Sequence, residues 1–170
     1  MDGLSLLAEA QAAGLRVRAQ GTLATTGGPL SNAIRRFSYA KERERPDDAL
    51  VDYMIAAESL FLSDVNRQDR GEMRYRLSHR AALFIDSPDY PRRAVFQYMR
   101  RAYDARSAVV HGAGVPDPKD LESPAGEALS IHGFTEITET LMRAALLKAI
   151  PIGRPGGRLG VDWDALIFPD

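Results

Sequence analysis

Apolar side chains recur at intervals of three and four residues over most of the chain, which is the spacing of one face of an α-helix. The first such stretch begins at Ser31, a predicted N-cap, and continues to the charged run that precedes Pro46. Its apolar face consists of Ala33, Ile34, Phe37 and Ala40. The pattern therefore predicts an amphipathic helix with one buried face.

The same spacing predicts further helices. The stretch 47–62 is apolar nearly all round, which is typical of a helix at the centre of a fold. Amphipathic stretches then extend from 73 to 85, from 91 to 110, and from the end of the loop 112–126 to about Pro151. No segment shows sustained strand alternation. The sequence therefore predicts an all-α fold, an antiparallel up-and-down helical bundle of four to five helices.

Three parts of the chain are expected to differ in structure. Residues 1–28 form a predicted N-terminal extension that ends in a Gly/Thr-rich break, and residues 29–152 form the predicted helical domain. Residues 153–170 form a predicted C-terminal tail, which begins with a glycine-rich loop and packs back onto the domain. The apolar residues expected to hold the tail there are Trp163, Leu166, Ile167 and Phe168.

Composition narrows the class of protein. The chain has 170 residues, 45% of them apolar, and no cysteine, which excludes thiol catalysis, zinc ribbons and iron–sulfur clusters. Its apolar runs are far shorter than the roughly 18 residues of a membrane span, and its first residues lack the basic flank of a signal peptide. We therefore expect a cytoplasmic protein without membrane association. The histidines lie on separate predicted helices, so no metal and no cofactor is expected.

Charge is distributed unevenly along the chain, although the net charge is only -1. Residues 67–106 carry 10 basic and 5 acidic side chains, and all 10 basic ones are arginine. The segments on either side are net acidic. Because the planar arginine fork suits bidentate contact with phosphate, one explanation is a phosphate-bearing partner. The other explanation is a coding bias combined with a solvated face.

Two charged residues interrupt apolar stripes. One stripe advances by four, three and four residues and places Arg106 on the core-facing side of its predicted helix. In the central helix, Glu58 interrupts an apolar stripe in the same way. A desolvated charge is costly unless it is paired. The sequence therefore predicts a direct salt bridge between Glu58 and Arg106 across two packed helices.

A second row of side chains lies beside the stripe that contains Arg106, again at intervals of four, three and four residues. This outer row consists of Arg100, Asp104, Ser107 and His111. Arg106 and His111 are roughly 140° apart around an ideal helix, but both can approach one small anion from two sides at a helix end. The alternatives are that His111 complements the helix dipole ahead of Gly112 and that Arg106 is part of a structural ion pair.

These stretches together resemble a domain of the HEPN superfamily, and in particular its Apea-like branch. The run RSAVVHG at 106–112 fits the superfamily pattern of an arginine, four to six residues and a histidine at the end of a long helix. The stretches LVDYMIAAESLFL at 50–62 and YRLSHRAALF at 75–84 are also similar to that branch, as is the run YDARS at 103–107. The resemblance covers roughly residues 30–150.

The resemblance implies a helical domain that dimerises. Many members of the superfamily are metal-independent endoribonucleases of toxin–antitoxin, anti-phage or CRISPR-linked systems. On that basis Arg106 and His111 take the catalytic positions, and Ser107 takes the polar position that follows the arginine. Active members often carry Asn, Asp or His where this chain carries Ser107.

Further expectations concern the surroundings of this centre and its partners. Glu58 and Asp104 are expected to support the site, and Arg100 and Arg101 to bind RNA. The expected partners are RNA, a second copy of the chain, and an antitoxin or other regulatory protein. Other members of the superfamily do not cleave RNA but bind a nucleotide or a partner protein. Both functions remain open at this point: an endoribonuclease with a site shared by two subunits, or a non-catalytic binding module.

Overall fold

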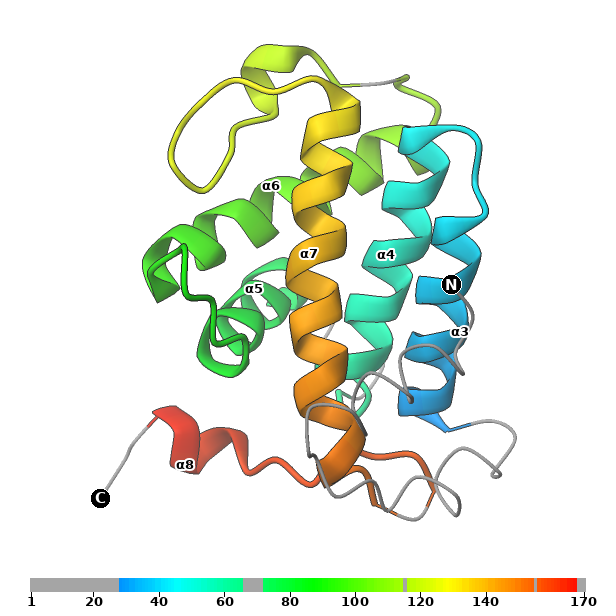
Figure 1. Ribbon diagram of the computed structural model, residues 1–170. Helices are drawn as coiled ribbons and strands as arrows, with labels where there is room; N and C mark the ends of the chain where they lie inside the picture. Colours follow the sequence, from blue (N-terminus) through cyan, green and yellow to red (C-terminus); the bar gives the residue numbers. More distant parts are fainter. Residues whose placement is uncertain (1–27, 66–71, 115, 155, 168–170) are drawn as a thin grey trace.

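The computed structural model describes residues 28–65, 72–114, 116–154 and 156–167, and in these ranges the chain is helical without any extended strand (Figure 1). Two isolated β-bridges occur in loops. The predicted all-α helical bundle is therefore confirmed. None of the described helices is both long enough and apolar enough to cross a membrane. The helices are α3 (Pro29–Lys41), α4 (Pro46–Phe61), α5 (Met73–Phe84), α6 (Arg92–Val110), α7 (Ile131–Ala149) and α8 (Trp163–Ile167), with short 3-10 helices η2 (Pro118–Asp120) and η3 (Ile150–Ile152).

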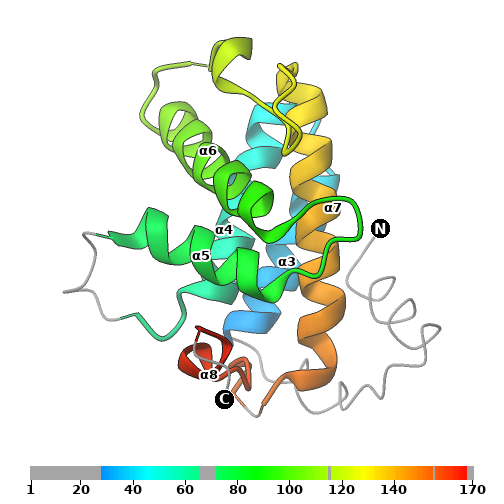
Figure 2. The same cartoon turned by 90° about the vertical axis from the view of Figure 1, so that its left-hand side faces the viewer.

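Helix α4 occupies the centre of the bundle and packs against α3, α5, α6 and α7. In Figure 1, α3 and α4 run in opposite directions, whereas α4 and α7 run in the same direction. The pair α5 and α6 lies on the other side of α4 from α3 and crosses the direction of α4 and α7 (Figures 1 and 2). The helices therefore do not follow the strict up-and-down order predicted from the sequence. The crossing pair α5 and α6 separates α4 from α7 in the sequence, and α4 and α7 run in the same direction.

The burial of α4 explains why its sequence is apolar nearly all round. Ten of its 16 residues are buried, including the large side chains of Leu50, Tyr53 and Met54. Its one partly open stripe includes Ile55 and Glu58, at the spacing of one helix face. A polar side chain on α4 can therefore reach solvent only along this stripe.

The N-terminus of α3 differs from the sequence prediction, because the N-cap is Gly28 and not Ser31. The backbone N–H of Leu30 donates to the carbonyl of Gly157 in the C-terminal tail at 2.8 Å. A Cβ atom on Gly28 would lie 2.5 Å from the carbonyl oxygen of Gly156, so only glycine allows this close approach. The helix thus begins where the tail satisfies its first backbone donor, the N–H of Leu30.

Trp163 holds the tail against the bundle. Its ring packs edge-on against Phe61 and Phe84, with centroid distances of 6.1 and 6.0 Å. The guanidinium of Arg80 lies 4.9 Å from the centroid of the same ring. Cation–π contact and aromatic packing therefore both favour the docked tail.

The other residues expected to hold the tail contribute differently. Leu166 and Ile167 remain 38% and 37% exposed, so the prediction that they pin the tail to the body is wrong. A five-residue helix offers too little surface to bury them together with Trp163. Phe168 and the N-terminal extension, apart from Gly28, lie outside the described residues.

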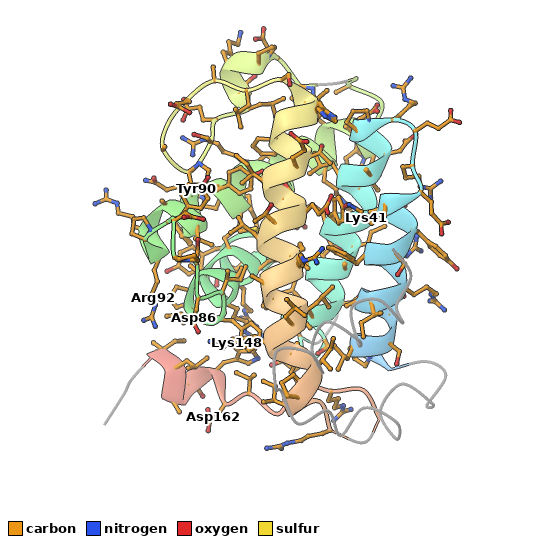
Figure 3. The ribbon with its side chains drawn as sticks, viewed as in Figure 1. Lys41, Asp86, Tyr90, Arg92, Lys148 and Asp162 are labelled. Carbon is orange, nitrogen blue, oxygen red and sulfur yellow. The ribbon has the colours of Figure 1, made fainter. Side chains whose placement is uncertain are left out.

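An ion pair joins α7 to the segment after α5 at the same end of the bundle. The ammonium of Lys148 contacts the carboxylate of Asp86, and both side chains can be followed in Figure 3. Lys148 also lies over the ring of Phe84, at 5.1 Å from its centroid. This contact connects the crossing pair α5 and α6 to α7 across a wide sequence separation.

The buried hydroxyl of Tyr98 provides a test of the packing between α6 and α7. It donates to the carbonyl of Phe134 and lies 2.8 Å from the hydroxyl of Thr138. We expect Tyr98→Phe to lower the free energy of unfolding by about 1 kcal/mol, because the hydrogen bond is lost while the ring stays packed. Urea denaturation measures this change. The control Tyr39→Phe, at a side chain that is 44% exposed, should change stability by less than about 0.5 kcal/mol.

Candidate functional site

The C-terminal end of α6 presents His111 to solvent. Gly112 has a φ of 75°, and its N–H donates to the carbonyl of Val109 at 3.2 Å. The N–H of Ala113 donates to the carbonyl of Ala108 at 3.0 Å, which completes a Schellman motif. His111 is therefore the C-cap residue, and it is exposed. Its imidazole makes no hydrogen bond or ion pair with any of the described residues.

Arg106 lies one turn earlier and faces α4. An Nη atom of Arg106 lies 3.5 Å from a carboxylate oxygen of Glu58, so the predicted salt bridge is confirmed. The two side chains keep 22% and 23% of their exposure, so the pair is partly buried. The Nε of Arg106 is buried and has no hydrogen-bond acceptor among the described residues. Glu58 therefore holds the guanidinium by one long contact.

Burial decides the electrostatics of this pair. It raises the pKa of Glu58 above the ordinary value, and the attraction of Arg106 only partly offsets this effect. The pKa of the Tyr103 hydroxyl is also raised, first by burial and then by the nearby carboxylate of Glu58. The three side chains form one electrostatic cluster between α4 and α6. Since desolvation outweighs the attraction of Arg106, the ionised carboxylate of Glu58 is less favoured here than in water.

Asp104 makes its close contacts outside this cluster, although its charge also helps to raise the pKa of the Tyr103 hydroxyl. Both of its carboxylate oxygens lie 2.8 Å from one Nη atom of Arg74 on α5. Asp104 therefore ties α6 to α5 at the surface, and its expected role beside Arg106 stays a prediction. Five residues line a surface pocket of about 290 Å³ around this pair: Arg74, Gln97, Arg100, Arg101 and Asp104.

The two arginines predicted to bind RNA have different surroundings. Arg101 is paired with Glu122, which lies in the loop before α7. The guanidinium of Arg100 lies 5.7 Å from the ring centroid of Phe96 and has no carboxylate partner among the described residues. Arg100 is thus the more available of the two for a phosphate.

Ser107 lies between the two predicted catalytic residues and is half-buried. Its backbone carbonyl accepts the N–H of His111 at 3.0 Å. Within the described part of the chain its hydroxyl has no hydrogen-bond partner. The end of α6 therefore carries a positioned arginine and an open histidine on neighbouring turns. The described residues contain no cluster of three metal-ligating side chains.

Sequence reasoning did not identify the partners of these arginines and carboxylates. Arg74 lies 30 residues before Asp104, and Glu122 lies 21 residues after Arg101. No local spacing joins residues so far apart, so only the packing of α5 on α6 and the path of the loop before α7 reveal these pairs. Tyr103, in contrast, shares the apolar stripe with Arg106, and that stripe is the signal for its part in the cluster.

The Glu58–Arg106 pair makes a pH-dependent prediction. Arg106→Gln removes the attraction that favours the ionised carboxylate, so the pKa of Glu58 should rise further. At pH 7 we expect the free energy of unfolding to fall by about 1 kcal/mol, less than for a fully buried pair, because both side chains are partly solvated. Below the ordinary glutamate pKa of about 4.3, protonated Glu58 needs no cation and the loss should disappear.

Urea denaturation at pH 7 and at about pH 4 measures this difference. The double variant Glu58→Gln, Arg106→Gln is the control, because it contains neither charge and should recover most of the loss at pH 7. An equal loss at both pH values would show that Arg106 acts through packing and not through the carboxylate.

Comparison with known proteins adds no assignment to this geometry. No protein-family model matches the chain, and neither a curated protein nor a solved structure gives a match. The chemistry of the residues at the end of α6 is therefore what bears on function.

Proposed function

We propose that the protein is a metal-independent endoribonuclease of the HEPN type, with a catalytic site shared by two subunits. The observation that supports this function is the pairing of a positioned cation with an open imidazole: Glu58 holds Arg106, and His111 is exposed five residues later. RNA carries its own nucleophile, the 2′-hydroxyl. The protein then needs a proton acceptor, a proton donor and a cation, which histidine and arginine supply near neutral pH.

The looseness of the Arg106 contact supports a role with phosphate. Asp104 contacts Arg74 through both oxygens at 2.8 Å, whereas Glu58 reaches Arg106 through one oxygen at 3.5 Å. A phosphate offers several anionic oxygens to the same guanidinium and forms shorter, charge-assisted hydrogen bonds. Arg106 is therefore suited to exchange part of its contact with Glu58 for a substrate phosphate.

In the proposed reaction, His111 accepts the proton of the 2′-hydroxyl as its oxygen attacks the adjacent phosphorus. The bond from phosphorus to the 5′-oxygen breaks, and that oxygen takes a proton from His111 of the partner subunit. Arg106 donates hydrogen bonds to the non-bridging oxygens, on which charge develops, and Ser107 orients the phosphate or the histidine. The products are a 2′,3′-cyclic phosphate and a 5′-hydroxyl.

The end of α6 also supports assembly of two subunits. Val110, next to His111, is 50% exposed, and an exposed apolar side chain beside a catalytic group suits a contact with a second copy. Two-fold symmetry would bring a second set of the same residues opposite the first. We place the activity in the cytoplasm, as an effector of a toxin–antitoxin or anti-phage system with an antitoxin or other regulatory partner.

A non-catalytic module that binds a nucleotide or a partner protein is the second candidate function. The observation that favours it is the position of His111 at the helix C-cap, where a histidine is useful without any catalysis, because a cation there complements the helix dipole. Cleavage assays separate the two candidates directly.

The first functional prediction concerns catalysis. Full-length protein incubated with mixed RNA in EDTA should cleave it, and His111→Ala and Arg106→Ala should each reduce the rate by at least about 100-fold. The control is His132→Ala on α7, a histidine whose side chain is 72% exposed and which should leave the rate unchanged. End-group analysis should find 2′,3′-cyclic phosphates. Cleavage that persists in His111→Ala, or that stops in EDTA, would exclude this mechanism.

The second functional prediction concerns assembly. Light scattering should show a homodimer at tens of micromolar, with an interface through α6 that buries about 1,600 Å² or more in total. Val110→Glu should shift the protein toward the monomer and reduce cleavage, because it places a charge in that interface. Ile152→Glu on η3, at another exposed apolar residue, is the control and should stay dimeric. A monomeric wild-type protein would remove the shared site.

A further inference from the structure

The outer face of α5 and α6 carries aromatic rings beside arginines. The rings of Tyr75 and His79 are stacked, with centroids 5.6 Å apart and an interplanar angle of 12°. Phe96 on α6 meets Tyr75 edge-on at 5.6 Å, and Arg100 lies over Phe96. We call these four residues the α5–α6 platform.

Core packing accounts for Phe96, which is partly buried against the hydrophobic core, but it does not account for Tyr75. The buried side of α5 consists of other residues, Leu77 and Phe84 among them. Tyr75 is 55% exposed, the highest exposure among the large hydrophobic side chains in the described part of the chain. A ring that is stacked on His79 and still mostly exposed keeps surface available for another flat group.

The same face is positively charged. Arg93 and Arg100 lie two turns apart on α6, which places them on one side of the helix. Neither has a carboxylate partner among the described residues. The acidic side chains nearby, Asp104 and Glu122, are already paired with arginines. The free guanidinium groups therefore favour an anionic partner.

We propose that the α5–α6 platform binds single-stranded RNA. An exposed aromatic ring beside arginines, here Tyr75, is an arrangement on which unpaired bases stack while phosphates contact the cations. A duplex hides the faces of its bases within its own stack, and a partner protein would not need both a free ring and free guanidinium groups. RNA as the particular nucleic acid rests on the proposed function.

The direction of α6 connects the platform to the candidate catalytic residues. Arg93, Gln97 and Arg100 continue the outer row, which leads through Asp104 to His111. The rise of an α-helix places residue 111 about 22 Å along the axis from residue 96. A strand whose bases stack at the platform can thus extend along α6 to the helix end. The platform would bind the flanking part of a substrate.

Fluorescence anisotropy with a labelled single-stranded RNA of about 16 nucleotides tests this proposal. The full-length protein carries His111→Ala, so that the RNA stays intact. Tyr75→Ala in this background should raise Kd at least about fivefold, the effect of losing one stacked base, whereas Tyr75→Phe should stay within about twofold. Tyr39→Ala, at an exposed tyrosine on α3, is the matched control and should also stay within about twofold.

A salt series tests the cationic part of the platform independently. Arg100→Gln should reduce the slope of log K against log salt by about 0.7, the value for one phosphate contact on a single strand. Arg35→Gln on α3, where Arg35 is bonded to Asn32, should leave the slope unchanged. Single-stranded DNA and duplex RNA of the same sequence are the competing probes.

The outcomes are decisive for the platform. The proposal would be overturned by any of four results: absence of RNA binding, an unchanged Kd in Tyr75→Ala, an equal loss in Tyr39→Ala, or tighter binding of DNA or duplex than of single-stranded RNA.

The nuclease proposal can fail independently of the platform. Tyr75-dependent binding without any cleavage by the wild-type protein would exclude the nuclease and leave the platform, whereas cleavage with a Tyr75-independent Kd would exclude the platform alone.

Discussion

The exclusion of α4 from water is the constraint on which the rest of the structure depends. Helices α3, α5, α6 and α7 all pack on it, and ten of its 16 residues are buried. Only one stripe of α4 stays partly open, and Glu58 lies on it. Helix α6 passes this stripe, so its partly buried Arg106 meets the carboxylate of Glu58. The candidate site is therefore a consequence of how the central helix is covered.

Partial burial determines how firmly Glu58 holds the guanidinium of Arg106. A fully exposed pair would leave the arginine free to move, and a fully buried pair with ideal geometry would use its hydrogen bonds within the protein. Here desolvation raises the pKa of Glu58 and the contact stays long, at 3.5 Å. The guanidinium is kept in place without being fully satisfied. That state suits the phosphate contact that we propose for Arg106.

The arginines of segment 67–106 serve two purposes. Arg80 binds Asp64 through two nitrogens and lies over Trp163, and Arg74 binds Asp104, so part of the positive charge holds the fold together. Arg93 and Arg100 have no such carboxylate partner among the described residues. The uneven charge of the sequence thus combines structural ion pairs with cations that remain available on the outer face of α6.

The sequence by itself determined the helices and the residues of the candidate site, because helix formation and helix faces depend on neighbours within a few residues. The sequence predicts the helix at 46–61 to within a residue at each end, and the spacing of the two stripes alone indicates Glu58 and Arg106 as partners. The activity assigned to Arg106 and His111 stays a prediction.

Only the tertiary structure decided the contacts between distant segments. The start of α3 at Pro29 depends on a carbonyl of the tail, and the crossing of α5 and α6 over α4 pairs Arg74 with Asp104. It also brings Tyr75 of α5 against Phe96 of α6. The energy of such contacts depends on the simultaneous packing of segments far apart in the chain, and no spacing within one helix encodes it.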